Sequence, residues 1–534
     1  MLRRLALAAV AALATCATAQ AASIGIVRVK EGDIAPVPAA QPGVSLYKGV
    51  PYAKPPVGEL RWRAPQPPES WVAVRSGARY GPACLQPPFA VPAREGLKES
   101  SDLFLPSASD GQSEDCLYLN VWSSAPDRFA RLPVMVYLHG GEFRTGSGDA
   151  PIQDPSRLAA KGLVVVTLNY RLGAFGFLNH PDLARESGAG SGNYGLLDQV
   201  AALKWVQENI GAFGGDPAQV TVFGGSAGAT SVSLLTASPL AKGLFQRAIA
   251  ESGTAFGARA SQPAATAEAA GVKFFKEIGA TSLAQARTVP AQDILRTQIR
   301  SAFAGRPTVG DAFMPKSPAA IYAAGQQNEV AFIAGWNADE YTLLAPKPPG
   351  GGSAAGFKAY LARRFGANVG AMQAAYPVKA DEDAVRAAGR LFGDEAFGAG
   401  AVRWTRLNAQ SGAKPGYLYY FNHAAPIPAD TVLFGKTGEE LGATHGGEMY
   451  YVYNALDDLA WPWTEQDRAL AAVMQSYWVN FARTGDPNGP GLPRWSAVGK
   501  SGAVRLMNFG DAPRMTIVPR GLAIDVINRP AKGR

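Results

Sequence analysis

The sequence predicts an α/β fold in which a mainly parallel central sheet is flanked by helices. Apolar runs of strand length alternate along the chain with segments of helical spacing. The strand runs are almost continuously apolar, as is typical of parallel strands that helices cover on both faces. The 534 residues are 47% hydrophobic and 18% charged, which indicates a globular protein with a large core.

The first half of the chain supplies three of the predicted strands. Residues 132–138 (LPVMVYL) and 163–169 (LVVVTLN) are apolar over strand length, and the second run is rich in β-branched side chains. Helical spacing follows at 194–210 and ends before a glycine. A third strand at 219–223 leads directly into a small-residue helix at 227–236. This order is that of repeated strand–helix units.

The second half continues the alternation between larger insertions. Strands are expected at 329–334 (EVAFIA) and 417–421 (YLYYF), and a long amphipathic helix at 465–483. Residues 83–115 and 350–414 do not follow the strand–helix pattern, so we expect them to be large loop and helical insertions. No stretch has the composition of a linker between two independent domains.

Residues 1–19 are predicted to be a signal peptide. Arg3 and Arg4 precede an apolar run, and Ala-Thr-Ala at 17–19 is a small-residue cleavage site. The run is too short to span a membrane comfortably, and no later segment looks membrane-spanning. We therefore expect an exported protein, periplasmic or secreted, with a single domain over residues 20–534.

The cysteines agree with export. Cys16 falls within the predicted signal peptide; a lipoprotein attachment there is an alternative, although the threonine before it fits that pattern poorly. Cys84 and Cys116 remain as an even pair, which can form a disulfide in an oxidising compartment. Such a bridge stabilises a fold by roughly 3–4 kcal/mol in the chain-entropy model. The alternative is two unrelated buried thiols.

The charge distribution argues against a nucleic-acid partner. The formal net charge is +8, but the basic residues are spread along the chain without clusters or interleaved aromatic residues. Two widely separated cysteines and four histidines give no metal-ligand pattern. We therefore expect a small-molecule substrate, no metal, no nucleic acid and, by default, a monomer.

The strongest functional signal is the turn around Ser226. In VTVFGGSAGAT, residues 220–230, a strand runs into G-x-S-x-G and then into a helix. Small neighbours let the chain reverse sharply, so that the hydroxyl projects above the sheet. The N–H of Ala227 lies at the helix start, where donors are unpaired. A serine hydroxyl becomes an effective nucleophile when a base takes its proton and hydrogen-bond donors are already positioned for the oxyanion. The alternative is an inert serine in a tight turn.

Other segments can supply the donors, the base and the acid. HGGEF at 139–143 follows a buried strand, where a serine hydrolase needs further oxyanion donors, although an ordinary glycine turn fits that segment nearly as well. The base should follow the serine, and His445 in its glycine-flanked loop is favoured over His423, which follows a strand. The acid should lie between them, and spacing cannot choose between Asp339 and Glu340.

Taken together, these residues resemble the carboxylesterase type-B family, which includes para-nitrobenzyl esterases, carboxylesterases and cholinesterases. The resemblance extends in order over most of the chain, and it lies in the segments YKGVPYAKPPVGELRWRAP from Tyr47, SEDCLYLNVW from Ser113, YLHGGEF from Tyr137, NYGLLDQVAALKWVQENIGAFGGDPAQVTVFGGSAG from Asn193, AESGT from Ala250, GWNADEYTLL from Gly335, ATHGGEMYYVY from Ala443 and YWVNFARTGDPNG from Tyr477.

The resemblance implies an α/β-hydrolase fold and assigns roles by position. It makes Ser226 the nucleophile, Glu340 the acid and His445 the base. It further implies supporting features, namely oxyanion donors at the backbone N–H groups of Gly141, Glu142 and Ala227, a serine that supports the triad from behind at Ser252, and a disulfide between Cys84 and Cys116.

Two departures from the family pattern bear on the chemistry. Gly225 stands where the family usually has glutamate, which removes a buried carboxylate near the histidine, so pH dependence or deacylation is expected to differ. Glu142 stands where the donor loop usually has glycine or alanine. Its carboxylate must point away from the developing oxyanion. It is either anchored by a nearby donor or contacts a polar or cationic group of the substrate.

The predicted function is hydrolysis of carboxylic esters through a Ser-His-Glu triad and an acyl-enzyme, with no cofactor. The alternatives are a specialised lactonase, carbamate or toxin esterase on the same triad, and a non-catalytic binding protein of the same fold. The binding relatives lack triad residues, which are all present here. A choline-ester specialist is disfavoured, because residues 84–116 contain no tryptophan for a cation–π platform.

Overall fold

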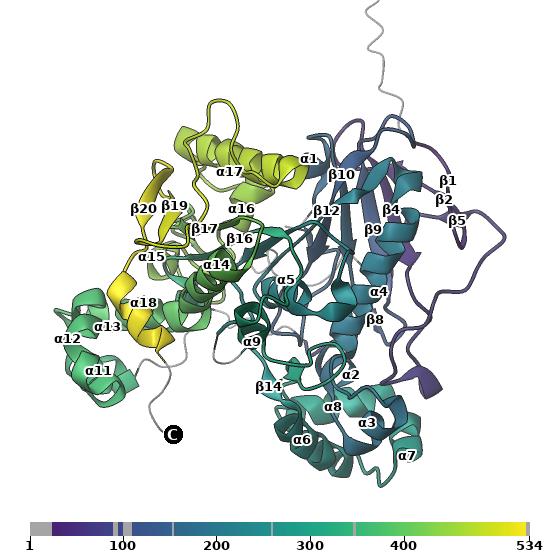
Figure 1. Cartoon of the computed structure of the whole chain (residues 1–534), viewed down its shortest axis with the longest axis horizontal. Coiled ribbons are helices and arrows are strands. Elements are labelled where there is room, and N and C mark those ends of the chain that lie inside the picture. The colour runs from purple at the N-terminus through teal and green to yellow at the C-terminus, as the bar shows by residue number, and fades with distance from the viewer. Residues whose placement is uncertain are drawn as a thin grey trace, which may run out of the picture.

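One large sheet connects the two halves of the chain (Figure 1). A computed structural model describes residues 24–88, 94–99, 109, 111–151, 154–257, 260–344 and 349–529. Within these residues the sheet has eleven strands, in the order β20-β19-β17-β16-β13-β12-β10-β11-β9-β4-β3. The predicted signal peptide, residues 1–19, lies outside the described residues.

The middle of the sheet is parallel and its edges are antiparallel. Neighbouring strands from β19 to β11 run parallel. The outer strands β20, β9, β4 and β3 pair antiparallel. The predicted mainly parallel sheet is therefore confirmed. In chain order, the strands are β3 (Val37–Pro38), β4 (Ser45–Pro51), β9 (Tyr118–Ser123), β10 (Leu132–Leu138), β11 (Val164–Leu168), β12 (Gly215–Gly225), β13 (Arg247–Glu251), β16 (Ala331–Asn337), β17 (Gly416–Phe421), β19 (Arg505–Phe509) and β20 (Arg514–Ile517).

The continuous apolar runs located the parallel strands closely. The run at 132–138 is β10, and all of its residues from Val134 onward are buried. Strand β12 is longer than the predicted 219–223, because its first residue, Gly215, pairs with Leu132 across a register shift. Glycine, aspartate and proline at the start of β12 are weak strand formers, which is why the sequence pattern missed them.

Helices flank the sheet: α5 packs on β12 and β13, and α17 on β10 and β12 (Figure 1). None of the described helices combines the length and the apolar character that crossing a bilayer requires. The α-helices are α1 (Ser156–Ala159), α2 (Gly173–Phe177), α3 (Pro181–Ser187), α4 (Tyr194–Asn209), α5 (Ala227–Ala237), α6 (Ala264–Glu277), α7 (Leu283–Thr288), α8 (Ala291–Arg300), α9 (Pro318–Ala323), α10 (Glu340–Leu344), α11 (Ala354–Phe365), α12 (Val369–Ala375), α13 (Asp381–Gly393), α14 (Ala399–Ser411), α15 (Gly438–Leu441), α16 (Met449–Val452), α17 (Glu465–Thr484) and α18 (Gly521–Asn528).

The two predicted insertions have different structures. Residues 350–414 are largely helical, since they contain α11 to α14, and part of this insertion packs with α18 around a small apolar core of its own (Figure 1). The described part of 83–115 instead carries short strands. The smaller strands of the molecule are β1 (Val27–Val29), β2 (Gly32–Ala35), β5 (Arg75–Ser76), β6 (Ala83–Cys84), β7 (Lys98–Glu99), β8 (Gln112–Ser113), β14 (Gln262–Pro263), β15 (Thr308–Val309) and β18 (Thr431–Val432).

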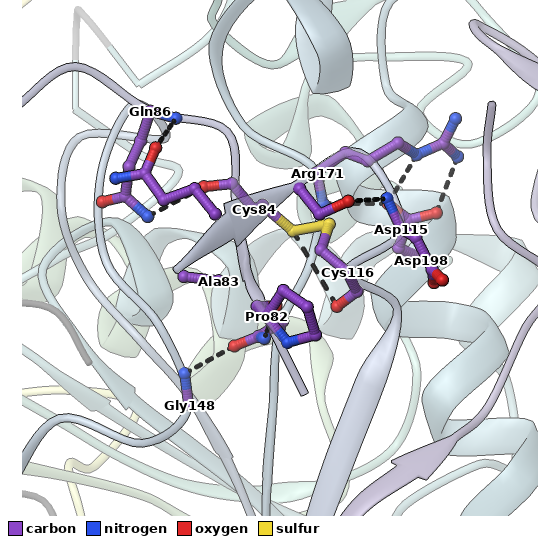
Figure 2. The surroundings of a disulfide bond; sticks show 12 residues. Pro82, Ala83, Cys84, Gln86, Asp115, Cys116, Gly148, Arg171 and Asp198 are labelled. Carbon is purple, nitrogen blue, oxygen red and sulfur yellow. Dashed lines mark hydrogen bonds and ion pairs between the residues drawn. A yellow bond between two sulfur atoms is a disulfide. The ribbon is translucent and has the colours of Figure 1, made fainter. Parts of the chain in front are cut away.

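A disulfide joins Cys84 to Cys116, which confirms the pairing implied by the resemblance (Figure 2). It links the end of β6 to the segment before β9, so the first insertion is tied to the edge of the central sheet. Close to it, the buried guanidinium of Arg171 binds both carboxylate oxygens of Asp198, at 2.8 and 2.6 Å (Figure 2). This bidentate pair connects the chain after β11 to helix α4.

Candidate active site

Ser226 lies at the tip of a sharp turn between β12 and α5. Its backbone has φ of 58° and ψ of −120°, a conformation that residues with side chains rarely adopt and that is typical of strained functional turns. The Ser226 N–H donates to the Glu251 carbonyl (2.8 Å), and its carbonyl accepts from the Thr230 N–H (2.9 Å). A Cβ on Gly228 would lie 1.9 Å from the Leu138 carbonyl oxygen. These close contacts fix the serine at the carboxyl edge of the sheet.

His445 contacts Glu340 across 105 residues of sequence. Glu340 is the first residue of α10, just after β16, and its side chain is fully buried. Its Oε2 lies 2.5 Å from Nδ1 of His445, while its Oε1 accepts the Asn337 N–H at 2.7 Å. A carboxylate at Nδ1 favours the tautomer that carries its proton there, which leaves Nε2 as the acceptor.

Neighbouring carboxylates raise the pKa of His445. Burial alone would lower this pKa, but the charge and hydrogen bond of Glu340 oppose that effect, and Glu448 and Glu142 add smaller contributions. The pKa of His445 therefore lies above the ordinary histidine value. The imidazole also stacks on Phe397, with ring centroids 5.2 Å apart and planes at 15°. This stacking restricts the orientation of the ring.

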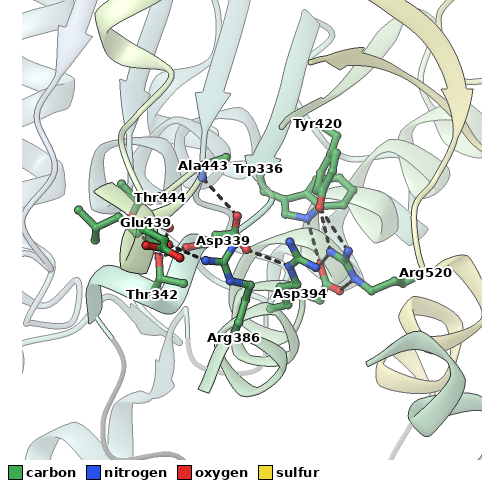
Figure 3. A network of polar contacts seen from close by, with 12 residues as sticks. Trp336, Asp339, Thr342, Arg386, Asp394, Tyr420, Glu439, Ala443, Thr444 and Arg520 are labelled. Atoms are coloured by element: carbon green, nitrogen blue, oxygen red, sulfur yellow. Dashed lines mark hydrogen bonds and ion pairs between the residues drawn. The ribbon is translucent and has the colours of Figure 1, made fainter. Parts of the chain in front are cut away.

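The two candidate acids have different partners. Asp339 Oδ1 accepts from Nε of Arg390 at 2.9 Å. Its Oδ2 accepts from the Ala443 N–H at 3.2 Å (Figure 3). The Asp339 N–H in turn donates to the Ala443 carbonyl at 3.0 Å. Asp339 thus holds the loop just before His445, whereas Glu340 contacts the imidazole itself.

A second buried carboxylate, Glu448, ties the histidine loop to the strand ends. Its Oε1 accepts from the Ser252 hydroxyl at 3.0 Å, and its Oε2 accepts from the Asn337 amide. Ser252 follows β13 and Asn337 ends β16, and β13 is the neighbour of β12 in the sheet. Glu448 therefore ties the loop that contains His445 to the end of the sheet at which Ser226 lies. Ser252 was expected from the family resemblance, whereas Glu448 was not, although an acid three residues after His445 in a glycine-rich loop was a usable signal.

The HGGEF loop lies against the turn at Ser226. A Cβ on Gly140 would be 3.1 Å from Cβ of Ser226. The next three residues, Gly141, Glu142 and Phe143, have φ of 109°, 57° and 59°. Neither the Gly141 nor the Glu142 N–H has an acceptor among the described residues. Free backbone donors beside a serine are what stabilisation of an oxyanion requires.

Two other histidines have separate contacts. His139 donates from Nδ1 to the Gly140 carbonyl (2.8 Å), and its ring stacks on Tyr170. Burial lowers the pKa of His139 to about 4, so the ring is neutral at neutral pH. His423 places Nε2 2.8 Å from Asp467 at the start of α17. His139 therefore packs within the HGGEF loop, whereas His423 binds a carboxylate in the first turn of α17.

Glu251, at the end of β13, is a third buried carboxylate, and its backbone carbonyl accepts from the Ser226 N–H. Its Oε1 accepts from Nε1 of Trp478 at 2.7 Å, and its Oε2 has no hydrogen-bond partner among the described residues. Burial, reinforced by the charge of Glu448, raises the pKa of Glu251 to about 8.

The described residues contain no group of three or more histidines, cysteines or acids arranged to hold a metal ion.

A Glu251→Gln variant is expected to gain stability relative to the wild type between about pH 5 and about pH 8. In this range the unfolded chain releases the Glu251 proton while the folded protein keeps it, so rising pH favours unfolding of the wild type. Glutamine can keep the Trp478 hydrogen bond and does not titrate. Thermal unfolding of both proteins at the two pH values measures the effect, and an identical difference in Tm at both would contradict it.

Comparisons with known proteins agree with one another. The family described as the carboxylesterase family matches residues 21–523. A fumonisin B1 esterase of Sphingopyxis macrogoltabida is 37% identical over 492 residues, which cover 88% of this chain and 83% of that protein. A para-nitrobenzyl esterase of Bacillus subtilis (strain 168) is 38% identical over 465 residues, covering 84% and 87%. A solved PNB esterase matches with a TM-score of 0.78 and 33% identity, over 95% of this chain and 100% of that one.

Proposed function

Because the chain belongs to the carboxylesterase family and is a carboxylic ester hydrolase, we propose that Ser226, His445 and Glu340 form its catalytic triad. His445 takes the Ser226 proton as the hydroxyl attacks the ester carbonyl, and Glu340 orients the imidazole and stabilises its charged form. The alcohol leaves with that proton. Water then attacks the acyl-enzyme, with His445 again acting as the base.

One observation carries this proposal. Nδ1 of His445 lies 2.5 Å from Oε2 of Glu340, although the two residues are 105 positions apart in the sequence. The loop of His445 is anchored by Glu448 to Ser252, directly after the strand next to β12. Ser226 occupies the strained turn at the end of β12. These positions at one edge of one sheet support the assignment of a nucleophile, a base and an acid to the three residues.

The oxyanion is stabilised in this proposal by the N–H groups of Gly141, Glu142 and Ala227. Ala227 is the first residue of α5, and the first N–H groups of a helix have no partner within it. The helix N-terminus also carries partial positive charge, which favours an anion there. The close approach of Gly140 to Ser226 supports the participation of the loop donors. Donors fixed by the backbone need no reorganisation when negative charge develops.

The substrate is a small-molecule ester, and the site of action is outside the cytoplasm. The disulfide between Cys84 and Cys116 supports an oxidising compartment, periplasmic or extracellular. In the same proposal, residues 1–19 direct export and residues 20–534 form a single catalytic domain.

Hydrolysis of a chromogenic acetate or butyrate ester, combined with covalent labelling, tests this function. A fluorophosphonate reagent should inactivate the enzyme by phosphonylating Ser226 with loss of fluoride, so that the peptide containing Ser226 gains the mass of the phosphonyl group. Loss of activity should follow the extent of labelling. Modification of Ser252 in place of Ser226, or full inactivation without modification of Ser226, would overturn the assignment of the nucleophile.

A further inference from the structure

A π-helical turn, Asp394–Gly398, joins α13 to α14 within the helical insertion. The N–H of Ala399 donates to the carbonyl of Asp394, five residues earlier in the chain. Such turns are rare within helices, and they occur frequently at functional sites. This one carries Phe397, whose ring stacks on the imidazole of His445. We call this turn the π-helix.

The backbone on either side of the π-helix packs tightly against the end of β16. A Cβ on Gly393, the last residue of α13, would lie 2.8 Å from Cβ of Glu340 and 3.3 Å from its Cγ. A Cβ on Gly398 would lie 2.8 Å from the ring of Trp336 on β16. Glycine at both positions permits this close approach. One short segment therefore contacts the candidate acid, Glu340, and the candidate base, His445.

A buried ion pair holds the start of the π-helix in place. Asp394 is 1% exposed, and its carboxylate accepts from Nε and Nη2 of Arg520 at 2.5 and 2.9 Å (Figure 3). The same carboxylate accepts from Nε1 of Trp336 at 3.1 Å and from the Tyr376 hydroxyl at 2.7 Å. Arg520 directly precedes α18, and its Nη2 also donates to the Tyr420 hydroxyl on β17 at 3.2 Å. The π-helix is thus tied to two neighbouring strands of the sheet and to the C-terminal helix.

The hydrogen bond to Glu340 does not by itself fix the ring of His445. That bond holds Nδ1, but the χ2 torsion of histidine is broad, and the ring can still turn about the line from Nδ1 to the carboxylate. Such a turn would move Nε2, which takes the proton in the proposed mechanism. The Phe397 ring lies at 15° to the imidazole plane, with centroids 5.2 Å apart. A contact with the face of the ring opposes the rotation that the hydrogen bond leaves free.

We propose that Phe397 is a positioning residue for His445, and that the ion pair of Asp394 with Arg520 acts on the same ring through the π-helix. This inference rests on the proposed function, since it takes His445 as the base. Proton transfer requires Nε2 within hydrogen-bond reach of the serine hydroxyl, and a misplacement of about 1 Å can lower a rate by about 10²-fold. The loss of such a positioning contact lowers kcat and leaves KM nearly unchanged.

Replacement of Phe397 by leucine and by tyrosine tests the positioning role, with a chromogenic butyrate as the substrate. Leucine is apolar but has no flat face, so we expect kcat to fall by about tenfold and KM to change by less than about twofold. Tyrosine keeps the ring and should keep a kcat close to that of the wild type. An equal loss of kcat in both variants would overturn the role of the ring.

Phe392→Leu is the matched control. Phe392 is half-buried, as Phe397 is, and its ring packs on Tyr341 and Tyr360. The control should lower Tm by an amount similar to that in Phe397→Leu and keep the wild-type kcat. If Phe392→Leu lost as much kcat as Phe397→Leu, the effect would be a general loosening of the insertion, and the proposal would be overturned.

The rate at which a fluorophosphonate modifies Ser226 gives a second readout, because this reaction also needs a base to take the serine proton. This rate should fall in Phe397→Leu by about the same factor as kcat. A wild-type kcat and a wild-type rate of modification in Phe397→Leu would overturn the proposal and leave the triad intact. Modification of a different serine in the wild type would instead overturn the proposed function.

Arg520→Lys tests the ion pair. Lysine keeps the positive charge but cannot form the two-atom contact with Asp394, so we expect kcat to fall by about threefold. In the Phe397→Leu background the same change should have no further effect, because both residues act on one ring. The control is Arg406→Lys, which alters a different ion pair between α14 and α18, with Asp525, and should leave kcat unchanged. An equal loss from Arg520→Lys in both backgrounds, or in the control, would overturn the role of the ion pair.

Discussion

Replacing Ser226 by alanine is expected to lower kcat/KM for ester hydrolysis by about 10⁴- to 10⁶-fold. Without the hydroxyl no acyl-enzyme forms, and the residual rate comes from water attack assisted by the oxyanion donors. The variant should keep the wild-type Tm, because alanine retains Cβ and the backbone hydrogen bonds of the turn to Glu251 and Thr230 are unaffected. Steady-state kinetics with a chromogenic butyrate, beside thermal unfolding, measure both effects.

Ser252→Ala is the matched control for this prediction. The Ser252 hydroxyl donates to Glu448 and acts on the histidine loop through that carboxylate, so a loss on the order of tenfold is expected. A hydroxyl is removed in both variants, at the ends of two adjacent strands, β12 and β13. If Ser226→Ala retained activity comparable to that of Ser252→Ala, Ser226 would not be the nucleophile.

The parallel core of the fold was predictable because its strands are buried on both faces. Residues 132–138 coincide with β10. The predicted helix at 194–210 extends only one residue beyond the end of α4. The antiparallel edge was harder, because strands such as β3 and β20 are short and half exposed and leave no continuous apolar run. The helices of 350–414 pack partly on a separate small core, so their arrangement depends on tertiary contacts that no local pattern encodes.

The candidate site could be predicted from local sequence only where a short segment shows its own steric requirement. The turn around Ser226 needs small neighbours, and that need is visible in the sequence. The choice between Asp339 and Glu340 was not visible, because adjacent residues share the same spacing to every other motif. Their partners in the fold separate them, since Asp339 binds Arg390 and Glu340 binds His445. Side chains that reach the site from distant segments, such as Phe397, left no local signal.

Replacing Glu340 by glutamine is expected to lower kcat by about 10³- to 10⁴-fold and to move the acid limb of the pH–rate profile to lower pH. Glutamine has nearly the same shape, but it cannot stabilise the charged imidazole or hold its tautomer. The base works when neutral, so activity falls as the pH drops through the pKa of His445. Since Glu340 raises that pKa, its removal lowers it, and the residual activity should persist to more acidic pH than in the wild type.

Asp339→Asn is the matched control, because it removes the carboxylate of the other candidate acid, which directly precedes Glu340. Asp339 holds Arg390 and the backbone of Ala443, so the loss of its charge should lower Tm through a loosened loop. The acid limb should stay where it is in the wild type, because the carboxylates that raise the pKa of His445 are Glu340, Glu448 and Glu142. Profiles of kcat/KM against pH for both variants decide between the two acids. If Asp339→Asn showed the larger loss of kcat together with the shifted limb, Asp339 would be the acid, and the contact between Glu340 and His445 would serve the fold alone.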